Sequence, residues 1–436
     1  MIPLSGQTMS TAPFNATEKL PQMFTVRQRF ARQAGLDLEK SIHHEIEKLA
    51  PKLQPDMRIA VGVGSRGITH LKQIVKSTLD ALRSAGTDPF IIPAMGSHGG
   101  ATAEAQAELL SEYGITEDTM GVPVQSTMSV QAIGRTADGD EVVWADPALK
   151  ADGVLVINRI KPHTDFSGKI GSGLIKMSVV GLGKQVGASA FHRAASRKGY
   201  ENTLRERFRF IAENTPLLGG LGLIENEHHE TAHIEWVPKE SFEACEEALF
   251  QQASDLMPKI PVDHVDLLIV DQIGKNISGA GMDPNVIGRS IHGYLTSPHT
   301  NPNGLTVRRI FVRDLTPETH GNAIGIGLAD MTTRRLVESM DASVTFVNAL
   351  TALSTNGAKV PIYFDTDREA IYRVLDTLAL DRLESARIVR IKDTLNLEVF
   401  QASTAFHSEI ESSASLEIEG SDEPMAFDSG DQLCPM

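Results

Sequence analysis

The sequence predicts an α/β protein with two domains, each built on a mostly parallel, Rossmann-like sheet. The first observation is that short apolar runs end in polar loops that contain glycine, at residues 58–64, 88–93 and 153–158. The second is that apolar residues at helical spacing follow two of these runs, at 71–82 and 103–113. Repeated strand–loop–helix order is typical of a parallel sheet covered by helices.

The same order returns in the second half of the chain. An apolar run at 265–270 is followed by a long loop, and the next strands are expected at 306–312 and 386–391. The remaining helices are expected at 204–213, 240–256, 332–339 and 368–378. A chain of 436 residues is long enough for two or three domains.

Changes in composition mark the expected boundaries. We expect a flexible N-terminal arm at 1–25 and an N-terminal α/β domain at 26–262, which ends in a proline-bearing break. A C-terminal α/β domain at 263–408 follows. Residues 409–436 contain eight acidic residues and no Lys or Arg, so we expect a disordered tail.

Composition also excludes several classes of protein. The 41 Lys and Arg stand against 56 Asp and Glu, and the formal net charge of −15 repels nucleic acids and anionic lipid surfaces. Residues 1–25 lack the pattern of a secretory signal, and no apolar stretch of about 18 residues could span a bilayer. Two cysteines cannot form a disulfide framework. We therefore expect a cytoplasmic protein that binds neither nucleic acid nor membrane.

The stretch from Asn158 to His192 is rich in glycine and contains several lysines. Glycines let the backbone approach a ligand closely, and neighbouring lysines suit a phosphate or carboxylate. The spacing of a phosphate-binding Walker loop is absent, and no dinucleotide fingerprint follows a strand in the proper context. The stretch therefore predicts an anion-binding loop of another kind.

Lys176 lies among apolar residues, from Leu174 to Val180. Partial desolvation lowers the pKa of such an amine and frees it for covalent chemistry. The alternative is an amphipathic lysine whose amine reaches solvent. The sequence alone leaves both interpretations open.

His98 and His163 each follow a predicted strand, in Gly96-Ser-His98 and Lys161-Pro-His163. Two imidazoles from separate loops could transfer protons on the two faces of a substrate. Each of them alone could equally be a hydrogen-bonded structural residue. With His192 they could instead form a three-histidine zinc site, although no close histidine spacing supports it.

Other candidate ligand-binding residues occur in two further loops. Ser65 and Arg66 follow the first predicted strand, where the guanidinium group could bind a phosphate or carboxylate. The loop at 276–289 offers Asp283, Asn285 and Arg289, and loops of this length are often functional.

The order and spacing of these residues resemble those of the nickel-pincer nucleotide-dependent lactate racemase family. Ser172-Gly173-Leu-Ile-Lys176 fits the family motif whose lysine is bonded to a pyridinium-derived mononucleotide that carries nickel. His192, sixteen residues later, corresponds to the histidine that coordinates the metal. His98 in a Gly-x-His turn and His163 in a Pro-His motif correspond to the two catalytic histidines.

This resemblance implies a racemase or epimerase of a 2-hydroxy acid that works by reversible hydride transfer, with its active site in the cleft between the domains. It implies a cofactor site made of Lys176, His192, Arg66, Ser65 and Gly173, with His192 as the metal ligand. It also implies a substrate site near Arg289, Asp283 and Asn285. The implied partners are a small-molecule 2-hydroxy acid and the proteins that make the cofactor, and a homo-oligomer is one option.

The sequence departs from the family pattern at several positions. Val63 stands where the family has an acidic residue, and Gly99 follows His98 where the family has arginine. Gly288 and Ile291 stand where the family has glutamine and lysine. We therefore expect a substrate that is larger than lactate or differently charged. A zinc-dependent hydrolase and a non-catalytic binding protein for a phosphorylated ligand are the alternative functions.

Overall fold

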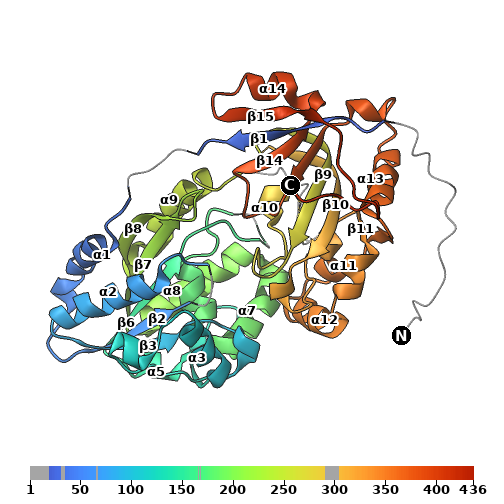
Figure 1. The fold of residues 1–436 in the computed structure, drawn as a ribbon. Coiled ribbons are helices and arrows are strands. Elements are labelled where there is room, and N and C mark those ends of the chain that lie inside the picture. The colour runs from blue at the N-terminus through green and yellow to red at the C-terminus, as the bar shows by residue number, and fades with distance from the viewer. Residues whose placement is uncertain (1–18, 31–34, 65–66, 165, 167, 290–303) are drawn as a thin grey trace. The chain divides into compact units, whose positions relative to one another are not determined.

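The chain divides into two compact units, shown in Figure 1. The computed structural model describes residues 19–30, 35–64, 67–164, 166, 168–289 and 304–436. One unit is Ala31–Pro258, which we call the central unit. The other combines Met1–Phe30 with Lys259–Met436, and we call it the flanking unit. The predicted break at 259–264 therefore lies at the division, whereas the N-terminal segment joins the flanking unit.

The central unit is built on a five-stranded sheet in the order β3-β2-β6-β7-β8. Its first four strands are parallel and β8 is antiparallel to β7. This confirms the predicted mostly parallel sheet. The strands are β2 (Arg58–Val63), β3 (Asp88–Pro93), β6 (Gly153–Arg159), β7 (Leu217–Glu225) and β8 (Thr231–Pro238).

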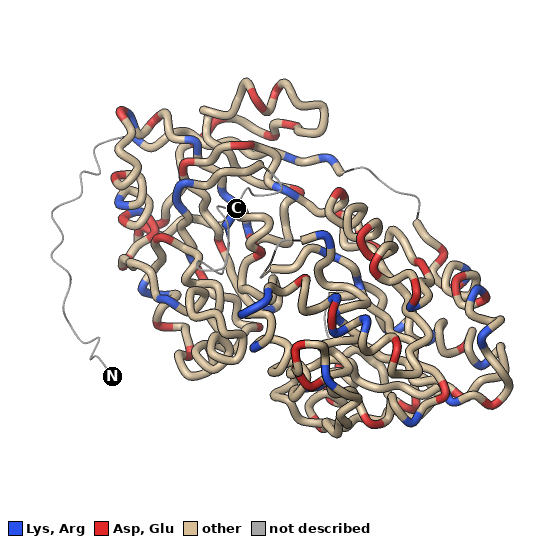
Figure 2. The backbone as a smooth tube through the Cα atoms, turned by 180° about the vertical axis from the view of Figure 1, so that it is seen from behind, with Lys and Arg blue, Asp and Glu red and all other residues tan. Residues whose placement is uncertain are grey.

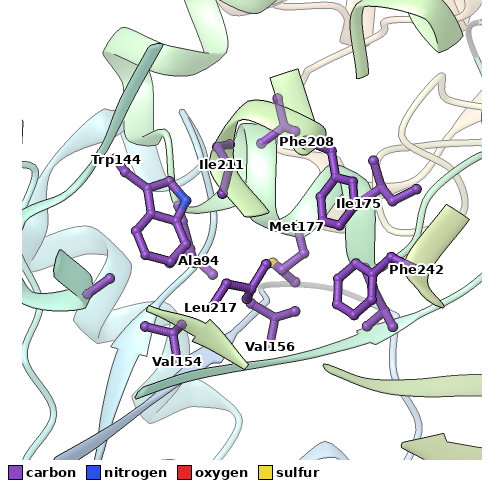
Figure 3. Packing of buried hydrophobic residues seen from close by; sticks show 14 of the residues in the cluster. Ala94, Trp144, Val154, Val156, Ile175, Met177, Phe208, Ile211, Leu217 and Phe242 are labelled. Carbon is purple, nitrogen blue, oxygen red and sulfur yellow. The ribbon is translucent and has the colours of Figure 1, made fainter. Parts of the chain in front are cut away.

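Both faces of this sheet are buried, because alternate residues of each strand point to opposite sides. Ile59 and Val61 pack on the side of α1 and α2, whereas Ala60 packs with Val154 and Val156 on the other side. On that second side, Trp144 and Met177 belong to the same apolar cluster as Leu217 of β7 (Figure 3). The Phe208 and Phe242 rings stack there, with centroids 5.1 Å apart.

Helices and a small hairpin complete the central unit. The hairpin pairs β4 (Val130–Arg135) with β5 (Glu141–Ala145). The longer helices are α1 (Leu38–Glu47), α2 (Leu71–Ser84), α3 (Ala103–Glu112), α7 (Lys184–Lys198), α8 (Tyr200–Asn214) and α9 (Phe242–Asp255). The shorter ones are α4 (Glu117–Met120), α5 (Asp146–Leu149) and α6 (Leu174–Lys176).

The flanking unit is built on an eight-stranded mixed sheet in the order β12-β11-β10-β9-β13-β14-β1-β15. The strands from β12 to β13 are parallel, and β14, β1 and β15 continue the sheet in antiparallel pairs. The strands are β1 (Met23–Gln28), β9 (His264–Ile273), β10 (Thr306–Leu315), β11 (Met331–Thr333), β12 (Ile362–Phe364), β13 (Ile388–Ile391), β14 (Val399–Ser403) and β15 (Leu416–Glu423). The helices are α10 (Pro284–Ile287), α11 (Arg334–Ser339), α12 (Ala342–Thr351), α13 (Asp367–Asp376) and α14 (His407–Glu411).

Both ends of the chain are more ordered than the sequence suggested. Part of the expected N-terminal arm, from Met23, belongs to β1, which lies between β14 and β15. The acidic residues 409–436 were expected to be disordered, but they include the strand β15. The physical reason is charge pairing across the strands, because Arg27 binds Glu419 and Arg29 binds Glu417. Paired carboxylates no longer repel one another, so the segment can join a sheet.

A second correction concerns 332–339, where a single helix was expected. Residues 331–333 form strand β11, and helix α11 begins only at Arg334. Thr333 caps this helix by accepting a hydrogen bond from the backbone N–H of Leu336.

Charged residues of both signs are interspersed along the chain, as Figure 2 shows. In the part of the chain that is described, no helix combines the length and apolar character that a bilayer crossing requires.

Candidate active site

Three loops of the central unit leave the sheet at the same edge. They follow β3, β2 and β6, which are adjacent and parallel. In open α/β sheets, ligands bind beyond the carboxyl ends of the strands. His98 lies in the loop after β3, and His163 in the loop after β6. The predicted residues therefore start from neighbouring positions.

The loop after β6 folds back on itself. Lys161 and Ser172 exchange two backbone hydrogen bonds of 2.9 Å, which close residues 162–171 into a loop. Glycine is required at position 171, because a Cβ atom there would lie 2.4 Å from the Lys161 carbonyl oxygen and 3.1 Å from the His163 nitrogen. This closure brings His163 back toward Lys176.

Lys176 ends the short helix α6 and is followed by a π-helical turn, Met177–Gly181. Its Nζ atom lies within hydrogen-bonding distance of Nε2 of His163. Two bonds fix the backbone on either side of the lysine. Asn158 donates its amide N–H to the Gly173 carbonyl at 2.9 Å, and the Trp144 indole N–H donates to the Ser178 carbonyl at 2.8 Å. An imidazole beside an amine can accept its proton and leave the amine nucleophilic.

Aromatic rings connect this pair to His192. The His163 ring stacks on Phe166 with centroids 4.7 Å apart, and Phe166 stacks on Tyr200 at 5.2 Å. The Tyr200 hydroxyl is 3.5 Å from Nδ1 of His192. The rings of His163 and His192 thus both lie within 6.4 Å of the Tyr200 ring. A tyrosine hydroxyl can orient an imidazole for metal binding through its other nitrogen.

The loop that carries His98 rests on the π-helical turn. Gly96 has a φ of +58°, and its N–H donates to the Gly181 carbonyl at 3.1 Å. The side-chain amide of Gln106 donates to the carbonyl oxygens of Gly96 and His98, at 3.0 and 3.1 Å. The His98 side chain itself is exposed, five residues beyond β3.

The Lys184 side chain binds the loop that carries His98. It is almost completely buried, with 1% of its surface exposed. Its Nζ donates to the Pro93 carbonyl at 2.5 Å and to the side-chain oxygen of Gln106 at 3.4 Å. Desolvation lowers the pKa of this amine to about 8. The Lys184 amine therefore loses its proton more readily than that of an exposed lysine.

Glu246 lies below α6 and is also fully buried. Its Oε2 accepts a hydrogen bond of 2.9 Å from the backbone N–H of Ile175. Oε1 has no hydrogen-bond partner among the described residues. Burial raises the pKa of this carboxyl to about 7. Both buried groups with large pKa shifts thus touch the segments that carry the predicted site residues, as is common at functional sites.

The substrate candidates of the flanking unit have structural partners. Asp283 caps α10 by accepting from the Asn285 N–H at 2.9 Å, and it also binds the Asn285 side chain. The Arg289 guanidinium donates to the Leu328 carbonyl at 2.8 Å and to the Asp330 carboxylate at 2.5 Å. These bonds are those of loop-stabilising residues, so their role in substrate binding stays a prediction. Ser65 and Arg66 lie outside the described residues.

The alternative of a three-histidine zinc site is not supported by the structure. No group of three or more His, Cys, Asp or Glu side chains that could hold a metal is found in the described part of the chain. His98, His163 and His192 all belong to that part, so they do not form such a cluster. A nickel-pincer nucleotide would need less from the protein: one amine for attachment and one imidazole for the metal. The Lys176 amine and the His192 imidazole are groups of this kind, and the rings of His163, Phe166 and Tyr200 connect them.

Sequence reasoning missed Glu246, Lys184 and Tyr200. The signal for Glu246 was its place on α9, where Phe242, Leu249 and Ala253 share the buried stripe. A charged residue in an apolar stripe indicates a specific buried partner. Lys184 had no comparable signal, because lysine after a glycine also fits an exposed turn.

The central unit is an α/β domain with a lysine–histidine pair at the carboxyl edge of its parallel strands. Residues 33–205 match the family model described as the lactate racemase N-terminal domain. Among solved structures, the lactate racemase apoprotein from Thermoanaerobacterium thermosaccharolyticum is similar, with 14% sequence identity and a TM-score of 0.45. That match covers 86% of this chain and 89% of the other. A search of curated proteins found no matching sequence.

Proposed function

We propose that this protein is a racemase or epimerase of a 2-hydroxy acid that uses a nickel-pincer nucleotide attached to Lys176. The observation that carries the proposal is the contact between the Lys176 amine and Nε2 of His163, inside the segment that matches the lactate racemase N-terminal domain. Lys176 follows Ser172-Gly173 as the family motif requires. The Lys176 side chain is half-buried.

The cofactor would be held by residues of the central unit. Lys176 would be the point of covalent attachment, and His163 lies where it could accept a proton from the Lys176 amine. His192 would bind nickel through Nε2, while the Tyr200 hydroxyl occupies Nδ1. Ser65, Arg66 and the backbone near Gly173 would bind its phosphate. When bound, the group supplies a hydride acceptor for the α-carbon of the substrate.

The two histidines would handle the proton of the substrate hydroxyl. Racemisation requires the same chemistry on both faces of the α-carbon, so a base is needed on each face. His163 and His98 reach the site from loops after two different strands, β6 and β3. One imidazole would accept the hydroxyl proton of one enantiomer, and the other imidazole would donate a proton to form the hydroxyl group of the opposite enantiomer. Asp283, Asn285 and Arg289 are proposed substrate contacts, and lactate is not the expected substrate.

Cofactor loading gives the direct test. The full chain is co-expressed with cofactor-making enzymes, and peptide mass spectrometry then locates any adduct while elemental analysis measures nickel. We expect one adduct on Lys176 and about one nickel per chain, and neither in Lys176→Ala. A panel of chiral 2-hydroxy acids, followed by loss of optical rotation, then identifies the substrate. Absence of the adduct from the wild-type chain under conditions that load a lactate racemase would refute the proposal.

A further inference from the structure

Glu246 occupies an unusual position for a carboxylate. It lies on the apolar stripe of α9 with Phe242 and Leu249 and has no exposed surface. Burying a charged group costs several kcal/mol unless hydrogen bonds or an opposite charge compensate. The carboxylate of Glu246 therefore needs local interactions that compensate for this cost.

The local role is to cap helix α6. A helix leaves its first N–H groups without partners inside the helix. Here the N-cap residue is Gly173, which has no side chain to accept them. Glu246 supplies the acceptor from α9, at 2.9 Å from the Ile175 nitrogen and with a further backbone bond from Leu174. The residue after Ile175 is Lys176.

Gly173 is shaped to fit this cap. A Cβ atom at position 173 would lie 2.4 Å from Oε1 of Glu246 and 2.5 Å from its carboxyl carbon. Such distances force the carboxyl group to move. The glycine of the Ser-Gly motif therefore makes room for Glu246, in addition to any contact that its backbone makes with a ligand.

The charge of Glu246 is only weakly compensated. Among the described groups that act on it, the nearest cation is Arg205, which binds Glu201, Glu243 and Glu247. The backbone N–H groups at the start of α6 are therefore its principal partners.

We propose that Glu246 is a positioning residue for Lys176. Its buried carboxyl ties the start of α6 to α9, and this tie keeps the Lys176 amine on Nε2 of His163. The proposal rests on the proposed function, in which that amine becomes the attachment point. It adds a residue from α9, outside the segment of 33–205 that matches the family model.

The test measures whether Lys176 and His163 remain coupled when the cap is removed. The full chain without cofactor is trace-labelled with acetic anhydride, and peptide mass spectrometry gives the rate at Lys176 relative to exposed Lys150. In the wild type we expect His163→Asn to lower this relative rate at least fivefold. In Glu246→Leu, which keeps the volume but removes the acceptor, the same replacement should change it less than twofold. A double-mutant cycle of this kind isolates the coupling from general destabilisation.

Three further variants make the result decisive. Glu246→Gln retains an acceptor oxygen and should restore most of the coupling. Gly173→Ala keeps the glutamate at position 246 but forces its carboxyl group to move, so this variant should lose the coupling. It provides the test if Glu246→Leu does not fold. Glu247→Gln, one residue along the same helix, is the matched control and should behave as the wild type. Equal coupling in Gly173→Ala, Glu246→Leu and the wild type would overturn the proposal, as would a wild-type rate that does not depend on His163.

The two proposals fail in different ways. Labelling uses the protein without cofactor, so the coupling is measured whether or not an adduct ever forms. A coupled Lys176 that never accepts the cofactor would refute the proposed function and leave the positioning role in place.

Discussion

Buried charges are arranged differently in the two units. In the flanking unit, Asp271 receives two hydrogen bonds from the Arg390 guanidinium, at 2.9 and 2.8 Å, and an ion pair from Arg313. Asp367, with no exposed surface, binds Arg313 and Arg335. The carbonyls of Leu433 and Cys434 complete this network. Asp271, Asp367 and Arg390 thus each face an opposite charge.

In the central unit, Glu246 and Lys184 are buried against backbone groups and an amide instead. Glu246 accepts from the start of α6, and Lys184 donates to the Pro93 carbonyl and to Gln106. A paired network fixes one structure, whereas weakly compensated charges have shifted pKa values and lie where reactive groups are positioned. We infer that the buried ion pairs of the flanking unit stabilise its fold. Glu246 and Lys184 of the central unit are instead expected to position reactive groups.

The largest effect is expected on turnover. His163→Ala and His98→Ala should each lower racemisation by about 10²–10⁴, the usual contribution of a general acid or base. The midpoint of urea unfolding should change little, because neither side chain is buried in a core. Kinetics with the identified substrate and denaturant unfolding measure both quantities. Retained racemisation in either variant would remove that histidine from the mechanism.

The second-largest effect is expected on the free energy of unfolding, through the buried ion pairs of the flanking unit. Asp367→Ala leaves the largely buried Arg313 without one of its carboxylates, and such a loss lowers the free energy of unfolding by about 3–5 kcal/mol. Urea unfolding of the full chain measures it. Asp365→Ala is the matched control, because Asp365 is exposed and its pair with Arg334 is worth less than about 1 kcal/mol. Similar losses in both variants would contradict the view that burial makes the network important.

The third effect should depend on pH. The folded pKa of Glu246 is about 7, above the ordinary value of 4.5, so the folded state holds its proton more tightly than the unfolded state. The carboxyl therefore stabilises the fold least at high pH, and the wild type loses stability as the pH rises through this range. Between pH 4.5 and 8, Glu246→Gln should gain about 3 kcal/mol relative to the wild type. A difference that does not vary with pH would contradict the assigned ionisation.

The smallest effect has the opposite sign. The pKa of Lys184 is lowered to about 8, so the folded state releases its proton more readily than the unfolded state. The wild type should gain about 2 kcal/mol relative to Lys184→Met between pH 7 and 9.5. Thermal or urea unfolding at both pH values measures the change, with Lys150→Met, an exposed lysine, as the control.

Three strands of the central unit could be predicted from the sequence, because each can be recognised from its own residues. Residues 58–63, 88–93 and 153–159 are continuous apolar runs, as strands buried on both faces require. It failed for β1 and β15, because their stability comes from each other. Arg27 of β1 and Glu419 of β15 are 392 positions apart, and neither segment alone shows a strong strand pattern.

Residues of the candidate site could be predicted only where a reactive side chain lies within a recognisable sequence motif. Lys176 and His163 could be named from their neighbours in sequence, and the structure brings them into contact. Glu246 could not, because a glutamate on α9 acquires its role only when that helix packs beneath α6. Arg289 shows the reverse case, since a plausible ligand-binding arginine binds Leu328 and Asp330 instead.

The position of β1 between β14 and β15 has a consequence for synthesis of the chain. The strand leaves the ribosome first, but its partners emerge nearly 400 residues later, roughly 20–80 s at ordinary elongation rates. The central unit is one contiguous segment and can fold during that interval. Nascent β1 must stay unpaired until β14 and β15 have been synthesised, so the sheet of the flanking unit cannot be completed before then.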